Sequence, residues 1–183
     1  AFLRHPRSTV RNFLRVPYLT NESNYNFFNY RLNQYRWEQL KRKFLREYNA
    51  LSAPVNLNQP FAFFPLQYQP ERTSNPIGGA YTNQKLAIET LRVSIPQDWV
   101  IYIKEHPKQV FPGGSHAHQG RYLGYYRDLL NVPNVQLVPF ETSNFDLIRH
   151  SKLVATIIGT AGWEAVLRNI PCIVFGYPWY QDC

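Results

Sequence analysis

Two segments of the sequence place polar or small residues directly after an apolar run. Residues 101–107 read IYIKEHP, and residues 154–165 read VATIIGTAGWEA. In an open parallel α/β sheet, ligands bind at the carboxyl ends of the strands, and helix N-termini at that edge hold phosphate groups. Two such strand ends in one chain predict a site for a phosphorylated ligand, and we expect a nucleotide there.

The first strand end carries three ionisable side chains, Lys104, Glu105 and His106, followed by Pro107. A lysine at this position can neutralise a phosphate, and a histidine can hydrogen-bond it or protonate it as it departs. We expect Pro107 to prevent a helix from continuing through this point. A surface loop with an ordinary ion pair is the alternative interpretation.

The second strand end is a turn of small residues, namely Gly159, Thr160, Ala161 and Gly162. Small side chains let backbone N–H groups approach an anion closely, and Thr160 can cap the following helix and donate its hydroxyl to phosphate. Glu164 lies in the first helical turn, where it can bond a ribose hydroxyl or simply interact with the helix dipole. Tight packing of the helix on the sheet is the alternative explanation for the small residues.

The polar loop of residues 67–79 follows the first predicted strand and contains Glu71 and Arg72. Because long loops at strand ends often carry function, we expect these side chains to contact substrate or to pair with each other. For a metal ion the sequence offers little, since it has no Asp-x-Asp, and His116 and His118 have no acidic ligand nearby. We therefore expect a metal-independent site without a cofactor.

The elements that must position these residues alternate between strand and helix. Strands are expected at residues 61–65, 99–104, 135–138, 153–158 and 172–175, and helices at residues 82–94, 119–130, 143–149 and 160–168. This alternation with short connections predicts a parallel sheet with right-handed crossovers, which is a Rossmann-like α/β domain over residues 61–183.

Residues 1–60 form a separate basic segment. They hold ten Lys and Arg against three Asp and Glu, a balance of +7, whereas residues 61–183 hold ten against nine, a balance of +1. Apolar residues recur at helical spacing over residues 26–48, which predicts a long basic amphipathic helix. We expect this helix to pack on its own domain or on another one. Contact with a membrane surface is the alternative, and we expect no nucleic-acid partner.

The composition narrows the class of protein. With 44% hydrophobic and 17% charged residues the chain is globular, and no run approaches the roughly 18 apolar residues that a membrane span needs. Residues 1–10 do not form a signal peptide, and Cys172 and Cys183 alone do not make a disulfide framework. We therefore expect a cytoplasmic protein, and the lack of methionine indicates a piece of a longer chain.

Five motifs carry a resemblance to a known family. They are residues 65–71 (PLQYQPE), 77–79 (IGG), 102–107 (YIKEHP), 156–165 (TIIGTAGWEA) and 171–176 (PCIVFG). Through these motifs, residues 61–183 resemble bacterial capsule polysaccharide biosynthesis and export proteins, which include the Kdo transferases of capsule assembly. Residues 1–60 carry no motif of this kind.

The resemblance implies a two-domain glycosyltransferase of the GT-B type, with residues 61–183 as most of its donor-binding half. It also implies a CMP-activated sugar acid, CMP-Kdo, as donor and a glycan or glycolipid acceptor at the cytoplasmic face of the inner membrane. The His-Pro dipeptide at residues 106–107 is similar to that of bacterial sialyltransferases, whose histidine contacts the donor phosphate. Gln67 stands where we associate a histidine with the family, and the catalytic base is expected in the acceptor-binding half, outside this sequence.

From the residues and the resemblance together we assign two sets of site residues. The candidate catalytic residues are His106, Glu105 and Glu71. The candidate nucleotide-binding residues are Lys104, Gly159, Thr160, Ala161, Gly162, Glu164 and Arg72. Two other functions stay open: a UDP- or CDP-dependent epimerase or polyol-phosphate transferase on the same fold, and a non-catalytic module that binds or exports polysaccharide.

Overall fold

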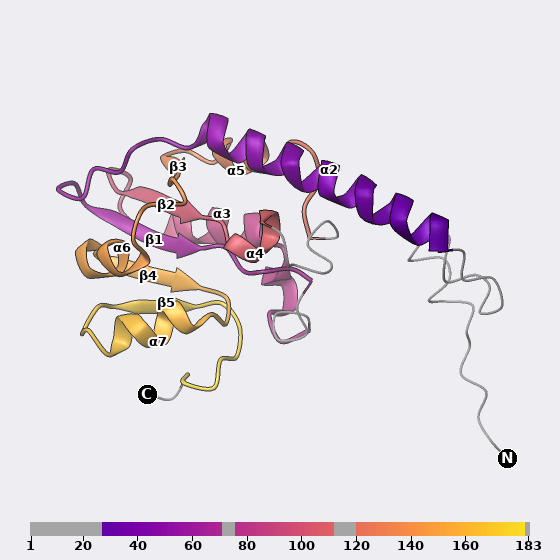
Figure 1. Ribbon diagram of the computed structural model, residues 1–183. Coiled ribbons are helices and arrows are strands. Elements are labelled where there is room, and N and C mark those ends of the chain that lie inside the picture. Colours follow the sequence, from indigo (N-terminus) through magenta and orange to yellow (C-terminus); the bar gives the residue numbers. More distant parts are fainter. Residues whose placement is uncertain (1–26, 71–75, 112–119, 182–183) are drawn as a thin grey trace, which may run out of the picture. The chain divides into compact units, whose positions relative to one another are not determined.

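The computed structural model describes residues 27–70, 76–111 and 120–181. A five-stranded parallel sheet with the order β3-β2-β1-β4-β5 forms its centre (Figure 1). The strands are β1 (Phe61–Pro65), β2 (Val100–Lys104), β3 (Val135–Leu137), β4 (Leu153–Thr156) and β5 (Cys172–Val174). Each of them lies within a strand predicted from the sequence, so the Rossmann-like α/β prediction is confirmed.

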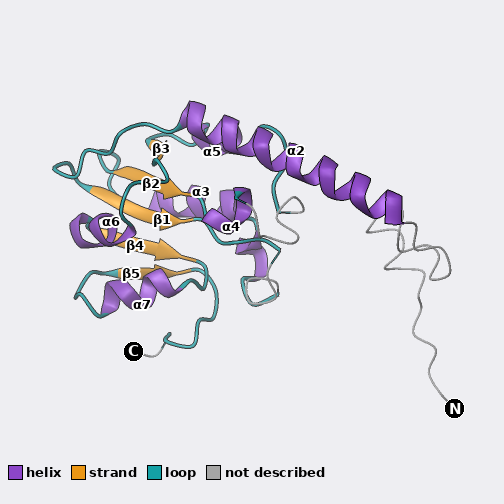
Figure 2. Cartoon of the chain, in the orientation of Figure 1, coloured by secondary structure: helices purple, strands orange, loops and turns teal. Residues whose placement is uncertain are grey.

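Helices cover both faces of the sheet (Figure 2). They are α2 (Phe27–Leu51), the 3-10 turn η2 (Gly79–Thr82), α3 (Gln84–Ser94), α4 (Pro107–Val110), α5 (Tyr125–Leu130), α6 (Asn144–His150) and α7 (Thr160–Val166). Leu91 of α3 and Leu129 of α5 join the core cluster that contains Phe64. Leu147 of α6 joins the opposite cluster, which contains Phe63. Neighbouring residues of β1 therefore face opposite layers, as the pleat of a strand requires.

The strand order places a topological switch beside β1. Ala62 of β1 pairs with Ile101 of β2 on one side and with Leu153 of β4 on the other. The chain runs outward from β1 through β2 to β3, and then crosses back to β4 and β5. Connections that leave the carboxyl ends of β1 and β4 therefore diverge, and they open a crevice at this edge of the sheet.

The chain divides into two compact units, residues 1–39 and 40–183, and the division falls within α2. The second unit therefore begins earlier than the expected boundary between residues 60 and 61. The reason is that the last turns of α2 belong to the core: Phe44 and Tyr48 are buried. The Tyr48 hydroxyl donates to the carbonyl of Val138, and its ring meets that of Tyr126 edge-on at 5.1 Å.

The segment after α2 is docked on the sheet. The backbone N–H of Ala53 donates to the carbonyl of Leu137 at 3.0 Å. The side-chain amide of Gln59 donates to the hydroxyl of Tyr102 at 2.6 Å. These contacts tie residues 53–59 to β2 and β3.

No helix continues through Pro107, as expected, but Pro107 itself begins the short helix α4, with His106 as the N-cap. Proline suits that position, since the missing N–H would have no partner inside the helix anyway. The helix expected from residue 119 begins only at Tyr125, because Gly124 adopts a left-handed φ of 88° and acts as its N-cap.

Candidate functional site

A cavity of about 520 Å³ opens at the topological switch, between the carboxyl ends of β1 and β4. Its volume lies within the range of roughly 300–1,000 Å³ that is typical of small-molecule sites. It is lined by Pro65, Leu66, Gln67, Tyr68, His106, Lys108, Asn144, Ile148, Ile158, Gly159, Thr160, Ala161, Glu164 and Trp179. The two strand ends singled out in the sequence therefore contribute to one cavity.

Gln67 links the two strands that flank the switch. Its side-chain amide donates to the hydroxyl of Thr156 in β4 at 2.9 Å. The same hydroxyl accepts the backbone N–H of Gly159 at 3.1 Å. A Cβ on Gly159 would lie only 2.6 Å from the Gln67 amide nitrogen, so only glycine leaves room for this link. Gln67 therefore fixes the wall of the cavity.

Two buried glutamines hold the loop that follows β1. Gln84 accepts the backbone N–H of Gln67 at 2.6 Å and donates to its carbonyl at 3.1 Å. Gln109 pairs with the backbone of Gln69 in the same way, at 2.9 and 2.8 Å. Each amide side chain thus replaces the backbone partner that a neighbouring strand would supply. The loop is fixed in place without being part of the sheet.

Glu105 forms a buried ion pair and does not line the cavity. Its carboxylate accepts from the Arg121 guanidinium at 2.6 and 2.9 Å and from the Tyr126 hydroxyl at 2.8 Å. Both side chains of the ion pair are fully buried. Burial acts to lower the pKa of Arg121, but the Glu105 carboxylate and the other neighbours hold it above its usual value. Both oxygens of this carboxylate already accept hydrogen bonds, so Glu105 holds its neighbours in position.

His106 faces the cavity, and its ring orientation is set by the backbone. The backbone N–H of His106 donates to the Glu105 carboxylate at 2.7 Å, and the ring Nδ1 accepts the backbone N–H of Lys108 at 3.2 Å. Because Nδ1 is an acceptor, the ring proton of the neutral imidazole lies on Nε2. The Tyr68 ring packs against the imidazole with centroids 5.6 Å apart.

Lys104 lies outside the cavity lining. Its ammonium group donates to the carbonyl of Thr142, and only 9% of the residue is exposed. Burial lowers the pKa of Lys104, and the nearby Glu141 carboxylate partly offsets this effect. The ammonium group of Lys104 is therefore held by Thr142, outside the lining of the cavity.

The turn at residues 159–162 divides between the cavity and the core. Gly159, Thr160 and Ala161 line the cavity. The N-cap of α7 is Gly159 without a side-chain hydrogen bond, so the capping role expected for Thr160 was wrong. Gly162 is buried instead, and a Cβ there would lie 2.9 Å from the Cys172 sulfur and too close to the Tyr180 hydroxyl. The last residue of the turn serves tight packing.

The remaining predictions divide by location. Glu164 lines the cavity. Glu71, Arg72, His116 and His118 lie outside the described residues, so their roles stay predictions. Sequence reasoning missed the cavity residues Tyr68, Lys108, Asn144 and Trp179, and it assigned no role to Gln67. The tyrosine and the glutamine belong to the loop already singled out after β1, which is the signal that could have indicated them.

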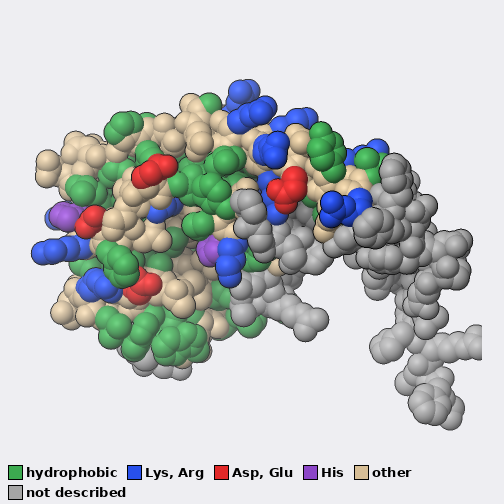
Figure 3. Space-filling model, in the orientation of Figure 1, with side chains coloured by type: hydrophobic (Ala, Val, Ile, Leu, Met, Phe, Trp, Pro, Cys, Tyr) green, Lys and Arg blue, Asp and Glu red, His purple; other side chains and the backbone are tan. Residues whose placement is uncertain are grey.

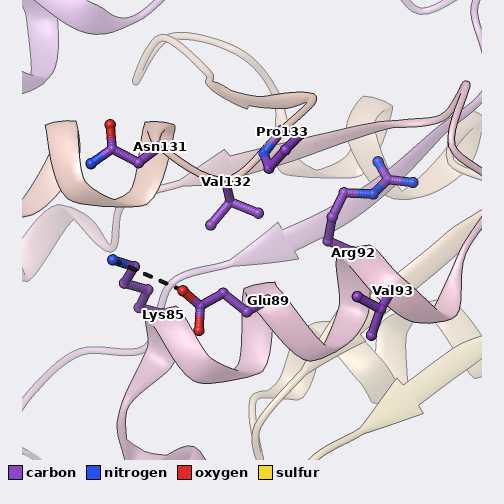
Figure 4. Close-up of a pocket in the computed structure, with 7 residues that line it drawn as sticks. All are labelled: Lys85, Glu89, Arg92, Val93, Asn131, Val132 and Pro133. Atoms are coloured by element: carbon purple, nitrogen blue, oxygen red, sulfur yellow. Dashed lines mark ion pairs between the residues drawn. The ribbon is translucent and has the colours of Figure 1, made fainter.

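A second, smaller hollow of about 240 Å³ lies between α3 and the connection from α5 to β3 (Figure 4). It is lined by Lys85, Glu89, Arg92, Val93, Asn131, Val132 and Pro133. Lys85 is paired with Asp128 at 2.6 Å and with Glu89 at 3.9 Å. None of the predicted site residues lines this hollow. Within the described ranges, no three His, Cys, Asp or Glu side chains are grouped so as to hold a metal ion.

Comparison with known protein families shows to which family this chain belongs. Residues 15–182 match the family described as capsule polysaccharide biosynthesis protein. The chain belongs to this family. The match extends well into residues 1–60, for which the sequence showed no motif. Among curated proteins, none matches the sequence significantly.

Two solved structures of KpsC from Thermosulfurimonas dismutans resemble the fold. One is described as a beta Kdo 2,7 transferase, with a TM-score of 0.52 and 18% identity over 80% of this chain and 40% of that chain. The other is described as a beta Kdo 2,4 transferase, with a TM-score of 0.52 and 19% identity over 79% of this chain and 46% of that chain. This chain thus spans less than half the length of either protein.

Proposed function

We propose that this chain is the donor-binding part of a glycosyltransferase of capsule polysaccharide synthesis. Its donor is a CMP-activated sugar acid, CMP-Kdo in our assignment, and its acceptor is a glycan or glycolipid. The observation that carries the proposal is the cavity at the topological switch, which brings His106 and residues 159–161 to one space. Membership of the capsule family and the fold shared with Kdo transferases support it.

His106 is suited to contact the phosphate that departs. When the bond between the anomeric carbon of the sugar and the phosphate oxygen breaks, negative charge develops on the phosphate of CMP. An N–H donor aimed at that charge stabilises the transition state, and the Nε2 proton of His106 supplies one. Lys108 also lines the cavity and adds a positive charge next to the same group.

The opposite wall binds the rest of the nucleotide. The hydroxyl of Thr160 and the small side chain of Ala161 border the cavity and serve as the second phosphate contact. Glu164, one turn further along α7, accepts a hydroxyl of the ribose. Gln67 holds this wall at a fixed distance from β1 through its bond to Thr156.

Glu105 has another role in this scheme, whereas Glu71 and Arg72 keep the role expected for them. Glu105 is a positioning residue, because its carboxylate orients the backbone of His106 and the guanidinium of Arg121. Glu71 and Arg72 remain candidates for substrate contact. The base that activates the acceptor lies outside this sequence, and the transfer proceeds without a metal ion.

A contact with the anionic inner face of the membrane completes the proposal. The exposed side chains of α2 include Arg31, Arg36, Arg42, Lys43 and Arg46. Figure 3 shows Lys and Arg side chains gathered along this helix. No helix in the described ranges is both long and apolar enough to cross a membrane. Such a basic face is attracted to anionic headgroups, at which a glycolipid acceptor would be presented.

The proposal is tested by thermal melting of the chain with CMP, CDP, UDP and no ligand. Binding to the folded state at a hundredfold excess over the Kd raises the Tm by roughly 5–10 °C for a chain of this size. We expect this shift with CMP and not with UDP. It should be lost in His106→Ala and kept in His150→Ala, because His150 is exposed at the end of α6 and does not line the cavity.

Other results would redirect the proposal. A shift with UDP or CDP in place of CMP favours an epimerase or polyol-phosphate transferase on the same fold. A shift with CMP that survives in His106→Ala contradicts the role given to that histidine. The absence of any shift, together with salt-sensitive binding to acidic polysaccharide, favours a non-catalytic module.

A further inference from the structure

An exposed tryptophan stands at the rim of the cavity. Trp179 lines the cavity, yet 71% of its surface is open to solvent. An indole is a large apolar surface, and beside a cavity such a surface is available to pack against a ligand. Figure 3 shows hydrophobic side chains gathered over α7 and the C-terminal segment.

The Trp179 ring is held by its neighbours. It packs against the Trp163 ring of α7 with centroids 5.0 Å apart and meets the Tyr180 ring edge-on at 5.3 Å. Tyr180 is buried, and its hydroxyl donates to the carbonyl of Gly159. Gly162 leaves space for that hydroxyl. These contacts hold the indole next to the turn that borders the cavity. The side chain therefore loses little conformational entropy when a planar group packs on it.

The cavity offers more room than a phosphate group needs. Its volume is about 520 Å³, and the contacts assigned to phosphate, His106 and Thr160, account for only part of its lining. Glu164, which is assigned to the ribose, belongs to the same lining, and it directly follows Trp163, the residue on which the indole packs. A base attached to that ribose therefore lies in the cavity that the indole borders. Every base has a π-face, and stacking on an aromatic side chain is its most common apolar contact.

We propose that Trp179 is the platform on which the nucleobase of the donor stacks. This inference rests on the proposed function, because it concerns the same cavity and the same nucleotide. It assigns to the C-terminal segment a role in nucleotide affinity that is independent of the phosphate contacts. Trp163 is a positioning residue in this arrangement, since its ring, in the first turn of α7, packs against the indole.

The test compares two probes, CMP and ribose 5-phosphate, by isothermal titration calorimetry. Both probes carry ribose and phosphate, but only CMP carries a base. Trp179→Ala is expected to weaken CMP roughly 5- to 150-fold, the range found when an aromatic platform is replaced by alanine. The affinity for ribose 5-phosphate should stay unchanged in this variant. Trp179→Phe should lie in between, because it keeps a smaller ring.

The matched control is Tyr177→Ala, which removes an aromatic side chain of 77% exposure from the same segment without touching the cavity lining. It should leave both affinities unchanged. Because Trp179 is exposed, its variants should unfold at nearly the wild-type Tm, and this is measured in parallel.

The outcomes separate the two proposals. If the wild type binds CMP and Trp179→Ala binds it with the same Kd, the stacking role is overturned and the proposed function stays intact. An equal loss of CMP and ribose 5-phosphate in Trp179→Ala also overturns it, because the effect then does not depend on the base. A wild-type chain that binds neither probe overturns the proposed function and the stacking role together.

Discussion

His106 gains its orientation from the residues next to it in the chain. Glu105 accepts its backbone N–H, and the backbone N–H of Lys108 is donated to its ring. The histidine therefore reaches the cavity with a fixed ring face and a defined tautomer before any ligand binds. Preorganised donors of this kind contribute to catalysis because they need no reorientation in the transition state.

Tyr125, whose ring packs against the Arg121 guanidinium, shows how burial couples stability to pH. Burial raises the pKa of its hydroxyl to about 12, against about 10 for an unperturbed tyrosine. The folded state thus favours the neutral form. The stabilising contribution is complete below pH 10 and is lost as the pH rises from 10 towards 12. We expect the free energy of unfolding to fall over this interval, by at most roughly 1.4 kcal/mol per pH unit for this group.

The variant Tyr125→Phe tests this pH dependence, because it lacks the hydroxyl that titrates. The hydroxyl is buried and has no hydrogen-bond partner within the described ranges, so its removal keeps the packing and relieves an unsatisfied group. Denaturant unfolding at pH 8 should show equal or higher stability for Tyr125→Phe. Between pH 10 and 12 its stability should fall less steeply than that of the wild type, and an identical slope would contradict the account.

At the scale of elements, the loop after β1 and the N-terminus of α4 are joined by one polar network. Arg121 donates to the Glu105 carboxylate and also to the Gln67 carbonyl at 3.0 Å. Its Nη1 reaches the side-chain oxygen of Gln69 at 3.1 Å. A single guanidinium therefore connects the end of β2 with both glutamines of the loop that lines the cavity.

Glu105→Gln should disrupt this network. The substitution leaves the Arg121 charge buried without its partner, so the free energy of unfolding should fall by about 3–5 kcal/mol. Denaturant unfolding measures this loss. The control Glu89→Gln alters an exposed carboxylate 3.9 Å from Lys85, and its stability should match the wild type. Equal stabilities for both variants would show that the buried pair does not hold the loop.

The exposed face of α2 leads to a prediction about membranes. The double variant Arg42→Glu with Arg46→Glu should reduce binding to vesicles of anionic lipid roughly tenfold or more, because each basic residue near such a surface contributes to attraction. Its control, Arg149→Glu with Lys152→Glu, makes the same change in net charge at two exposed positions near α6. Cosedimentation at low and high salt measures the effect. An equal loss in both double variants would assign the attraction to net charge alone.

At the scale of the whole molecule, the arrangement of the sheet could be predicted from the sequence, whereas the contacts inside the site could not. Apolar runs bounded by turn residues gave β1 with its observed bounds, Phe61–Pro65. The pairing of Gln84 and Gln109 with loop backbone depends on tertiary distances that no local pattern contains. Lys104 shows the same limit, because a charge at a strand end does not reveal that its ammonium group will donate a hydrogen bond to the carbonyl of Thr142.

The glycine-rich turn was ambiguous for a physical reason. Phosphate binding and tight packing both need small side chains, so the residue types at 159–162 could not distinguish them. In the structure the first residues of the turn line the cavity, and Gly162 packs against Tyr180. Trp179 was missed because an exposed aromatic residue after the last strand has no periodic pattern to mark it.

The central claim is that the donor nucleotide occupies the cavity at the topological switch. Amide hydrogen exchange of the full chain with and without CMP tests this claim most directly. The account predicts that CMP slows exchange in residues 66–68, 106, 108 and 158–161, which line the cavity or lie between residues that do, and leaves residues 85–93 at the smaller hollow unchanged. Protection at residues 85–93 without protection at the cavity would contradict it, and so would unchanged exchange throughout at saturating CMP.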